Sequence, residues 1–87
     1  MANVTRDAII REVLKVLENL LEIPKQNISM DDRIVDDLGM DSDDATYLFI
    51  PRLQKTFKLR PDPRRWRDVV TVGDVIDFVI REIHTQE

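Results

Sequence analysis

The sequence contains no cysteine, one histidine, two glycines and no long apolar run. Without cysteine there are no disulfides, no thiolate metal sites and no thiol nucleophile. The single histidine, His84, does not make a zinc site and lies far along the chain from either serine. No apolar run approaches the roughly 20 residues that cross a bilayer, and the first residues do not resemble an export signal. We therefore expect a cytoplasmic protein without stable membrane insertion.

The length of the chain limits the number and size of the domains that it can form. A chain of 87 residues with 43% apolar side chains predicts one small globular domain over residues 1–87. So short a chain leaves little material to enclose a deep substrate pocket. We therefore expect a protein that is not an enzyme.

Apolar residues recur at helical spacing in three parts of the chain. These patterns predict helices over 5–22, 42–57 and 72–84, and Asp62-Pro63 predicts the start of a short helix over 63–69. No alternation typical of strands competes with them. The sequence thus predicts an all-α fold: a small four-helix bundle of three longer helices and one short helix, with a long ordered loop between the first and second.

Capping residues mark the ends of the predicted helices. Thr5 is suited to cap the first helix, and Pro24 follows its end because the residue before a proline is disfavoured in a helix. Thr71 and Asp74 resemble a capping box at the start of the last helix.

Pro51 interrupts the second predicted helix. It has no N–H to donate and its ring clashes with the preceding turn, at a cost of about 3 kcal/mol in a regular helix. We expect a kink or bulge near residues 47–51, after which the helix resumes to about Phe57. Its buried face is predicted to comprise Ala45, Leu48, Phe49, Leu53 and Phe57.

Residues 24–41 show no sustained period and are predicted to form the long loop. Gly39 is expected to supply an unusual backbone angle just before the second helix. Isolated apolar side chains of this loop are expected to insert into the core as plugs: Ile28, Met30, Ile34, Val35 and Leu38.

Charge is distributed in blocks along the chain. The net charge is −4, yet residues 29–47 carry seven Asp against one Arg, and residues 48–67 carry seven Lys or Arg against one Asp. This order predicts a surface with two electrostatic faces, which steers partners more than it sets the fold.

The segment from Asp36 to Ser42 holds the candidate for chemistry. Ser42 lies at a predicted loop–helix junction, where a hydroxyl is exposed and a phosphoester on it would meet free backbone N–H groups. With no base nearby, we interpret the serine as an attachment point that another enzyme modifies. An ordinary helix cap is the alternative interpretation of an isolated Asp-Ser.

The sequence Asp-Asp-Leu-Gly-Met-Asp-Ser at positions 36–42 resembles the acyl carrier protein family, which has Asp-Ser-Leu at this junction, usually after Asp-x-Leu-Gly-x. Phe57, Leu59 and Pro61, followed by Thr-Val-Gly-Asp-Val-Ile-Asp-Phe-Val at 71–79, resemble the end of that family's second helix and its last helix. The resemblance spans about residues 5–83.

The resemblance implies that Ser42 receives 4′-phosphopantetheine from coenzyme A through a Mg²⁺-dependent phosphopantetheinyl transferase. The terminal thiol would hold acyl groups as thioesters for the acyl-transfer and acyl-synthesis enzymes of fatty-acid, specialised lipid or polyketide-type synthesis. A monomer is implied, with an apolar interior that shelters the acyl chain between helices, for which the candidates are Leu48, Phe49, Trp66, Val69 and Ile76. The implied partner-binding residues are Asp41, Asp43, Asp44, Tyr47, Ile50, Arg52 and Lys55.

The sequence departs from the family pattern in three ways. Asp43 follows the serine where the family usually has an apolar Leu, and Pro51 coincides with one extra residue in the second helix. Basic residues stand where the family is usually acidic, namely Arg52, Lys55, Lys58 and Arg60. We therefore expect a specialised stand-alone carrier with its own partners.

Two other functions compete with this interpretation. One is a carrier-like protein–protein interaction domain that is not phosphopantetheinylated, with Asp43 marking the lost site. The other is a binder of nucleic acid or anionic membranes that uses basic residues around an aromatic one: Arg60, Arg64, Arg65, Trp66 and Arg67. The acidic segment and the acidic last helix would oppose a polyanion, so we expect no nucleic-acid partner.

Overall fold

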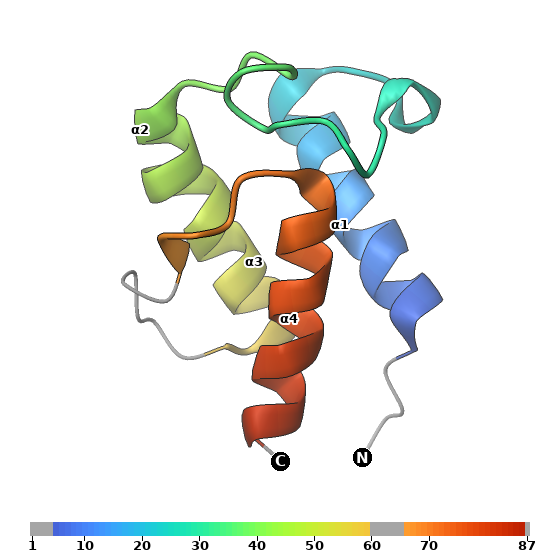
Figure 1. The fold of residues 1–87 in the computed structure, drawn as a ribbon, viewed down its shortest axis with the longest axis vertical. Coiled ribbons are helices and arrows are strands. Elements are labelled where there is room, and N and C mark those ends of the chain that lie inside the picture. Colours follow the sequence, from blue (N-terminus) through green and yellow to red (C-terminus); the bar gives the residue numbers. More distant parts are fainter. Residues whose placement is uncertain (1–4, 60–65, 87) are drawn as a thin grey trace.

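The described residues form three long helical segments, with a long loop between the first two (Figure 1). The computed structural model describes residues 5–59 and 66–86. The α-helices are α1 (Arg6–Leu21), α2 (Ser42–Asp44), α3 (Ile50–Phe57) and α4 (Val72–Gln86). A 3₁₀ turn, Lys25–Asn27, follows α1, and a π-helix, Ala45–Phe49, joins α2 to α3. The predicted all-α class is confirmed, since this part of the chain contains no β-strand.

The ends of α1 follow from its capping residues. The Thr5 side chain accepts a hydrogen bond from the Ala8 N–H at 3.1 Å, as predicted for an N-cap. At the other end Glu22 takes a left-handed φ of 56° and its N–H donates to the Glu18 carbonyl at 2.8 Å. Pro24 then follows, as expected. The most deeply buried side chains of α1 are Ile9, Val13, Val16 and Leu17.

α2, the π-helix and α3 form one continuous helix from Ser42 to Phe57, here called the composite helix. In its π-helical turn the Ile50 N–H donates to the Ala45 carbonyl, five residues back. A π-turn accommodates one extra residue, so the predicted bulge before Pro51 is confirmed. Of the predicted buried face, Phe49 and Leu53 are buried and Ala45 and Phe57 are half-buried. The prediction that Leu48 is buried is wrong, because Leu48 is 52% exposed and in the wider π-turn does not share the inward face of Ala45 and Phe49.

The long loop is anchored to the segment before α4. The Ile34 N–H donates to the Val70 carbonyl at 3.0 Å, and the Val72 N–H donates to the Asp32 carbonyl at 3.0 Å. Near the end of the loop Gly39 has a φ of +80°, which confirms the unusual backbone angle expected there. The plugging side chains Ile28, Ile34 and Met40 are buried, and Met30 and Leu38 are half-buried. Val35 is 43% exposed, so its predicted role as a plug is wrong.

The predicted capping box at the start of α4 is confirmed. The Asp74 N–H donates to Thr71 Oγ1 at 3.0 Å, and Asp74 Oδ2 accepts from the Thr71 N–H at 3.0 Å and the Val70 N–H at 3.1 Å. These donors, that of Thr71 first, hold the pKa of Asp74 below its ordinary value of 3.8. The carboxylate therefore helps to fix both α4 and the loop that is anchored beside it.

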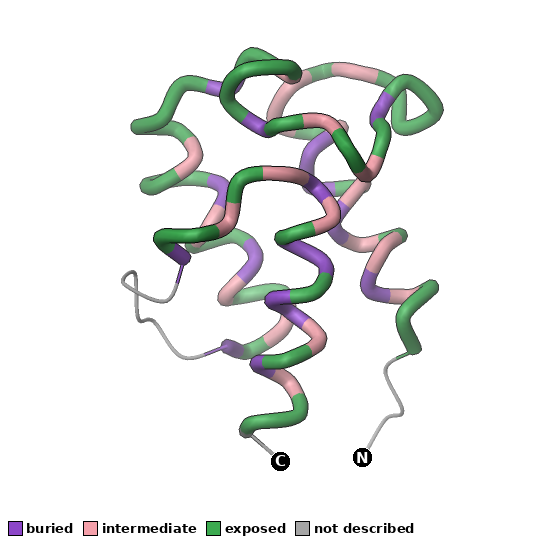
Figure 2. Tube along the Cα trace, viewed as in Figure 1, coloured by how far each residue is buried: buried purple, intermediate pink, exposed green. Residues whose placement is uncertain are grey.

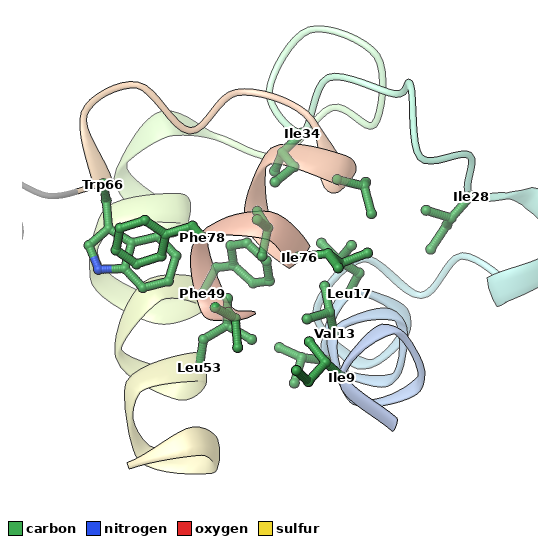
Figure 3. Close-up of a cluster of buried hydrophobic side chains, with 14 of the residues drawn as sticks. Ile9, Val13, Leu17, Ile28, Ile34, Phe49, Leu53, Trp66, Ile76 and Phe78 are labelled. Carbon is green, nitrogen blue, oxygen red and sulfur yellow. The ribbon is translucent and has the colours of Figure 1, made fainter. Parts of the chain in front are cut away.

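The core lies where α1, the composite helix and α4 meet (Figures 2 and 3). Trp66 is buried and packs against Phe78 of α4, with ring centroids 4.2 Å apart and the planes inclined by 45°. Residues 63–65 of the expected short helix over 63–69 lie outside the described residues, and the other four, 66–69, are described and form no α-helix. Its described remainder turns at 67–68, leaving Val69 half-buried and Val70 exposed. No helix of the described residues is long and apolar enough to cross a membrane.

Candidate functional site

Ser42 is the first residue of the composite helix, at the end of the long loop. It is exposed, and its hydroxyl makes no hydrogen bond to a described residue. Asp41 occupies the N-cap position and its side chain makes no capping bond either. Ser42 is therefore not the helix cap that was the alternative interpretation. Its side chain is exposed to solvent.

The backbone at this junction leaves donors free. The first hydrogen bond of the composite helix runs from the Ala45 N–H to the Asp41 carbonyl at 2.9 Å. The N–H groups of Ser42, Asp43 and Asp44 precede it and have no carbonyl within the helix to accept them. A phosphoester on the Ser42 oxygen fits these donors, since an anion at a helix amino terminus is stabilised by free N–H groups and by the helix dipole.

Three exposed carboxylates surround the serine, those of Asp41, Asp43 and Asp44. They take part in no ion pair among the described residues. A diffusing anion would be repelled by them, whereas a covalent ester is held regardless of that repulsion. No cluster of three or more His, Asp or Glu side chains in the described residues could hold a metal ion.

The remaining sequence-predicted partner residues divide between two faces. Tyr47, Arg52 and Lys55 are exposed on the composite helix, together with Leu48 and Pro51. Tyr47 is 73% exposed, which is high for an aromatic side chain. Ile50 is only partly exposed and turns toward the core, so the structure does not group it with the other six.

A small apolar cavity of about 40 Å³ lies behind the composite helix. Phe49, Trp66 and Val69 line it, as expected, whereas Leu48 and Ile76 do not. Four further residues line the cavity that the sequence pattern did not indicate: Ile34, Ala45, Ile50 and Val75. Ala45 and Ile50 are five residues apart, a spacing that a π-turn brings to one face and a regular helix does not. A second, larger hollow is lined largely by charged side chains and is unsuited to an acyl chain.

The loop residues that precede Ser42 are held to a residue that lines the cavity. Ile34 lines the cavity, and its carbonyl accepts a hydrogen bond from the Met40 N–H at 3.1 Å. Met40 is itself buried and lies two residues before Ser42. The chain thus fixes an exposed hydroxyl at one end of the composite helix and an apolar interior behind that helix.

Comparison with known proteins connects this arrangement to a family, although no protein-family model matches the chain. The acyl carrier protein of Clostridium acetobutylicum is 30% identical to it over 79 residues, which cover 91% of this chain and 99% of the relative. The chain belongs to the acyl carrier protein family. The family expected from the residues around Ser42 and from those at 71–79 is thereby confirmed.

Two further acyl carrier proteins match over nearly their whole length. That of Coprothermobacter proteolyticus is 25% identical, over 93% of this chain and 98% of the relative. That of Tropheryma whipplei is 27% identical, over 90% of this chain and 94% of the relative. An acyl carrier role follows for this chain in general terms, and the all-α fold agrees with it.

Proposed function

We propose that Ser42 is the attachment site for 4′-phosphopantetheine and that the chain carries acyl groups for acyl-transfer and acyl-synthesis enzymes. One observation supports the proposal: in a chain of this family, Ser42 is exposed, begins a helix, and has a hydroxyl that makes no hydrogen bond to a described residue. When attached, the arm supplies a terminal thiol that holds an acyl group as a thioester. The protein itself contributes the attachment point, a place for the chain and a surface for partners.

The local geometry supports Ser42 over the other serine. Ser29 Oγ accepts a hydrogen bond from the Asp31 N–H at 3.3 Å, and the Ser29 N–H donates to Asp32 Oδ2 at 2.8 Å. Ser29 therefore takes part in the turn that shapes the loop. The Ser42 hydroxyl makes no such hydrogen bond to a described residue, so it is available to a transferase.

The cavity behind the composite helix supports the sheltering role. Its volume of about 40 Å³ is enough for the end of a small apolar group and too little for a long chain. The helices would have to part further to take in more carbons. Phe49, Trp66 and Val69 would then contact the chain first, because they already line the cavity.

The first test is intact mass before and after incubation with coenzyme A, Mg²⁺ and a broad-specificity phosphopantetheinyl transferase. We expect a gain of one phosphopantetheine on the wild-type chain and on Ser29→Ala, and none on Ser42→Ala. Ser42→Ala should keep its free energy of unfolding within about 0.5 kcal/mol, because its side chain neither caps the helix nor packs. Circular dichroism and urea unfolding check that the variant is folded.

Loading of folded Ser42→Ala would contradict the proposed attachment site. If the wild-type chain gains nothing, Asp43→Leu serves as the second variant, because Asp43 puts a charge where the family's apolar contact is expected. If Asp43→Leu is loaded and the wild-type chain is not, the charge of Asp43 blocks the broad-specificity transferase. The wild-type chain would then need a different transferase that tolerates this charge. No loading of either chain would favour the unmodified interaction domain.

A further inference from the structure

The outer face of the composite helix carries two opposite charges separated by apolar side chains. Asp43 and Asp44 are exposed at one end, and Arg52 and Lys55 are exposed at the other. Tyr47 and Leu48 lie between them and are 73% and 52% exposed. We call these residues, with the exposed Pro51, the bipolar face: Asp43, Asp44, Tyr47, Leu48, Pro51, Arg52 and Lys55.

Helical spacing places these residues on one surface. Tyr47, Pro51 and Lys55 follow one another at intervals of four residues, and Leu48 and Arg52 are also four apart. Asp43 and Lys55 are twelve residues apart, roughly 18 Å along a regular α-helix at 1.5 Å per residue, a length that the π-turn shortens only in part. That separation exceeds the Debye length of about 8 Å at physiological ionic strength, so a partner meets two distinct charged ends.

The charges of the bipolar face are not used within the fold. Among the described residues, neither the acidic pair nor Arg52 and Lys55 form an ion pair. Exposed apolar side chains of this size, held on a helix and bordered by free charges, are typical of a protein interaction site. A uniformly basic or uniformly acidic partner would be attracted at one end and repelled at the other.

We propose that the bipolar face docks a protein partner of matching charge order. Such a partner places basic residues against Asp43 and Asp44, apolar residues against Tyr47 and Leu48, and acidic residues against Arg52 and Lys55. Arg52 and Lys55 thereby select against partners that are basic over the whole length of the helix. The biological role of this docking rests on the proposed carrier function, whereas the charge selectivity itself does not require a modified Ser42.

Three synthetic helical peptides test the charge order. All share a Leu-rich centre: the first has Glu at its amino end and Lys at its carboxyl end, the second has Lys at both ends, and the third has Glu at both ends. Each is titrated into ¹⁵N-labelled Ser42→Ala protein, which excludes any contribution from modification. We expect the Glu–Lys peptide to bind about tenfold more tightly than either other peptide, with shift changes at 43–55.

Charge reversal at the basic end is the decisive variant. In Arg52→Glu/Lys55→Glu the Lys–Lys peptide should become the tightest binder. Arg11→Glu/Lys15→Glu is the matched control, because these exposed residues of α1 give the same change in net charge on another surface. The control should keep the preference for the Glu–Lys peptide. Circular dichroism confirms that both double variants remain helical.

Several results would overturn the proposal. They are equal or undetectable binding of the three peptides, shift changes that fall outside 43–55, and a preference that the control reverses as well. Adsorption of the protein to anionic vesicles of phosphatidylglycerol through Arg52 and Lys55 would make a membrane the occupant instead. Concentration-dependent shifts of the bipolar face without peptide would make it a second copy of the chain. Because Ser42 is absent throughout, none of these results bears on the attachment site.

Discussion

Asp74 shows how one exposed carboxylate contributes to the fold in a pH-dependent way. The N–H groups of Thr71 and Val70 lower the pKa of Asp74 below its ordinary value of 3.8. Because the folded-state pKa is the lower one, the charged group stabilises the fold above the unfolded-state pKa. That contribution is lost as the pH falls through the folded-state pKa. Stability should therefore decline in acid as Asp74 becomes protonated.

Asp74→Asn isolates this contribution. We expect the variant to lose up to about 1 kcal/mol of unfolding free energy at pH 7, the usual scale of a helix cap. The wild-type and variant curves should converge as the pH falls through the folded-state pKa of Asp74, which lies below 3.8, because Asp74 then becomes protonated in the wild-type chain as well. Urea unfolding followed by circular dichroism from pH 2 to pH 7 measures both curves. Asp68→Asn removes an exposed carboxylate outside the cap, and an equal loss there would contradict the assignment.

At the scale of the element, the π-helix allows Pro51 to lie within a continuous helix. In a regular helix the Pro51 ring would clash with the carbonyl four residues back, at a cost of about 3 kcal/mol. The extra residue of the π-turn displaces that carbonyl, and Ile50 donates to Ala45 instead. The exposed Thr46 lies within this turn, so deleting it should convert the π-turn into a regular helix.

Deletion of Thr46 should therefore depend on residue 51. In the presence of Pro51 we expect a loss of about 3 kcal/mol, since the clash returns. In a Pro51→Ala background the same deletion should cost markedly less, because alanine donates its N–H and has no ring. Chemical unfolding of the four chains gives the coupling free energy between the two changes. Equal losses in the two backgrounds would show that the π-turn does not serve the proline.

The sequence predicts elements of this molecule better than it predicts the direction of single side chains. Caps at Thr5 and Thr71 depend on local hydrogen bonds, so their residue types were enough. Pro51 revealed that the helix is interrupted, but not which side chains the wider turn directs inward. The pattern therefore predicts a buried Leu48 and does not predict that Ala45 lines the cavity. Val35 was misplaced because the loop's contacts depend on pairing with residues far along the chain.

At the scale of the whole molecule, α4 carries one valine that packs in the core and also lines the cavity, and another that only packs in the core. Val75 and Val79 are both fully buried on this helix, yet only Val75 lines the cavity behind the composite helix. Replacing either valine with alanine removes the same atoms from the core and should cost about 1–3 kcal/mol. Only Val75→Ala enlarges the space available to an acyl chain.

The two variants should therefore respond differently to an acyl group carried on the arm that we propose for Ser42. If the chain enters the cavity, it binds the folded state alone and raises the melting temperature. The rise on acylation should be larger in Val75→Ala than in Val79→Ala, by about 4 °C or more for each kcal/mol of additional contact. Thermal unfolding of the loaded chains, with and without a medium-length acyl group, measures both rises. Equal rises would mean that the acyl chain lies elsewhere, whereas a larger rise in Val75→Ala alone would place it against α4.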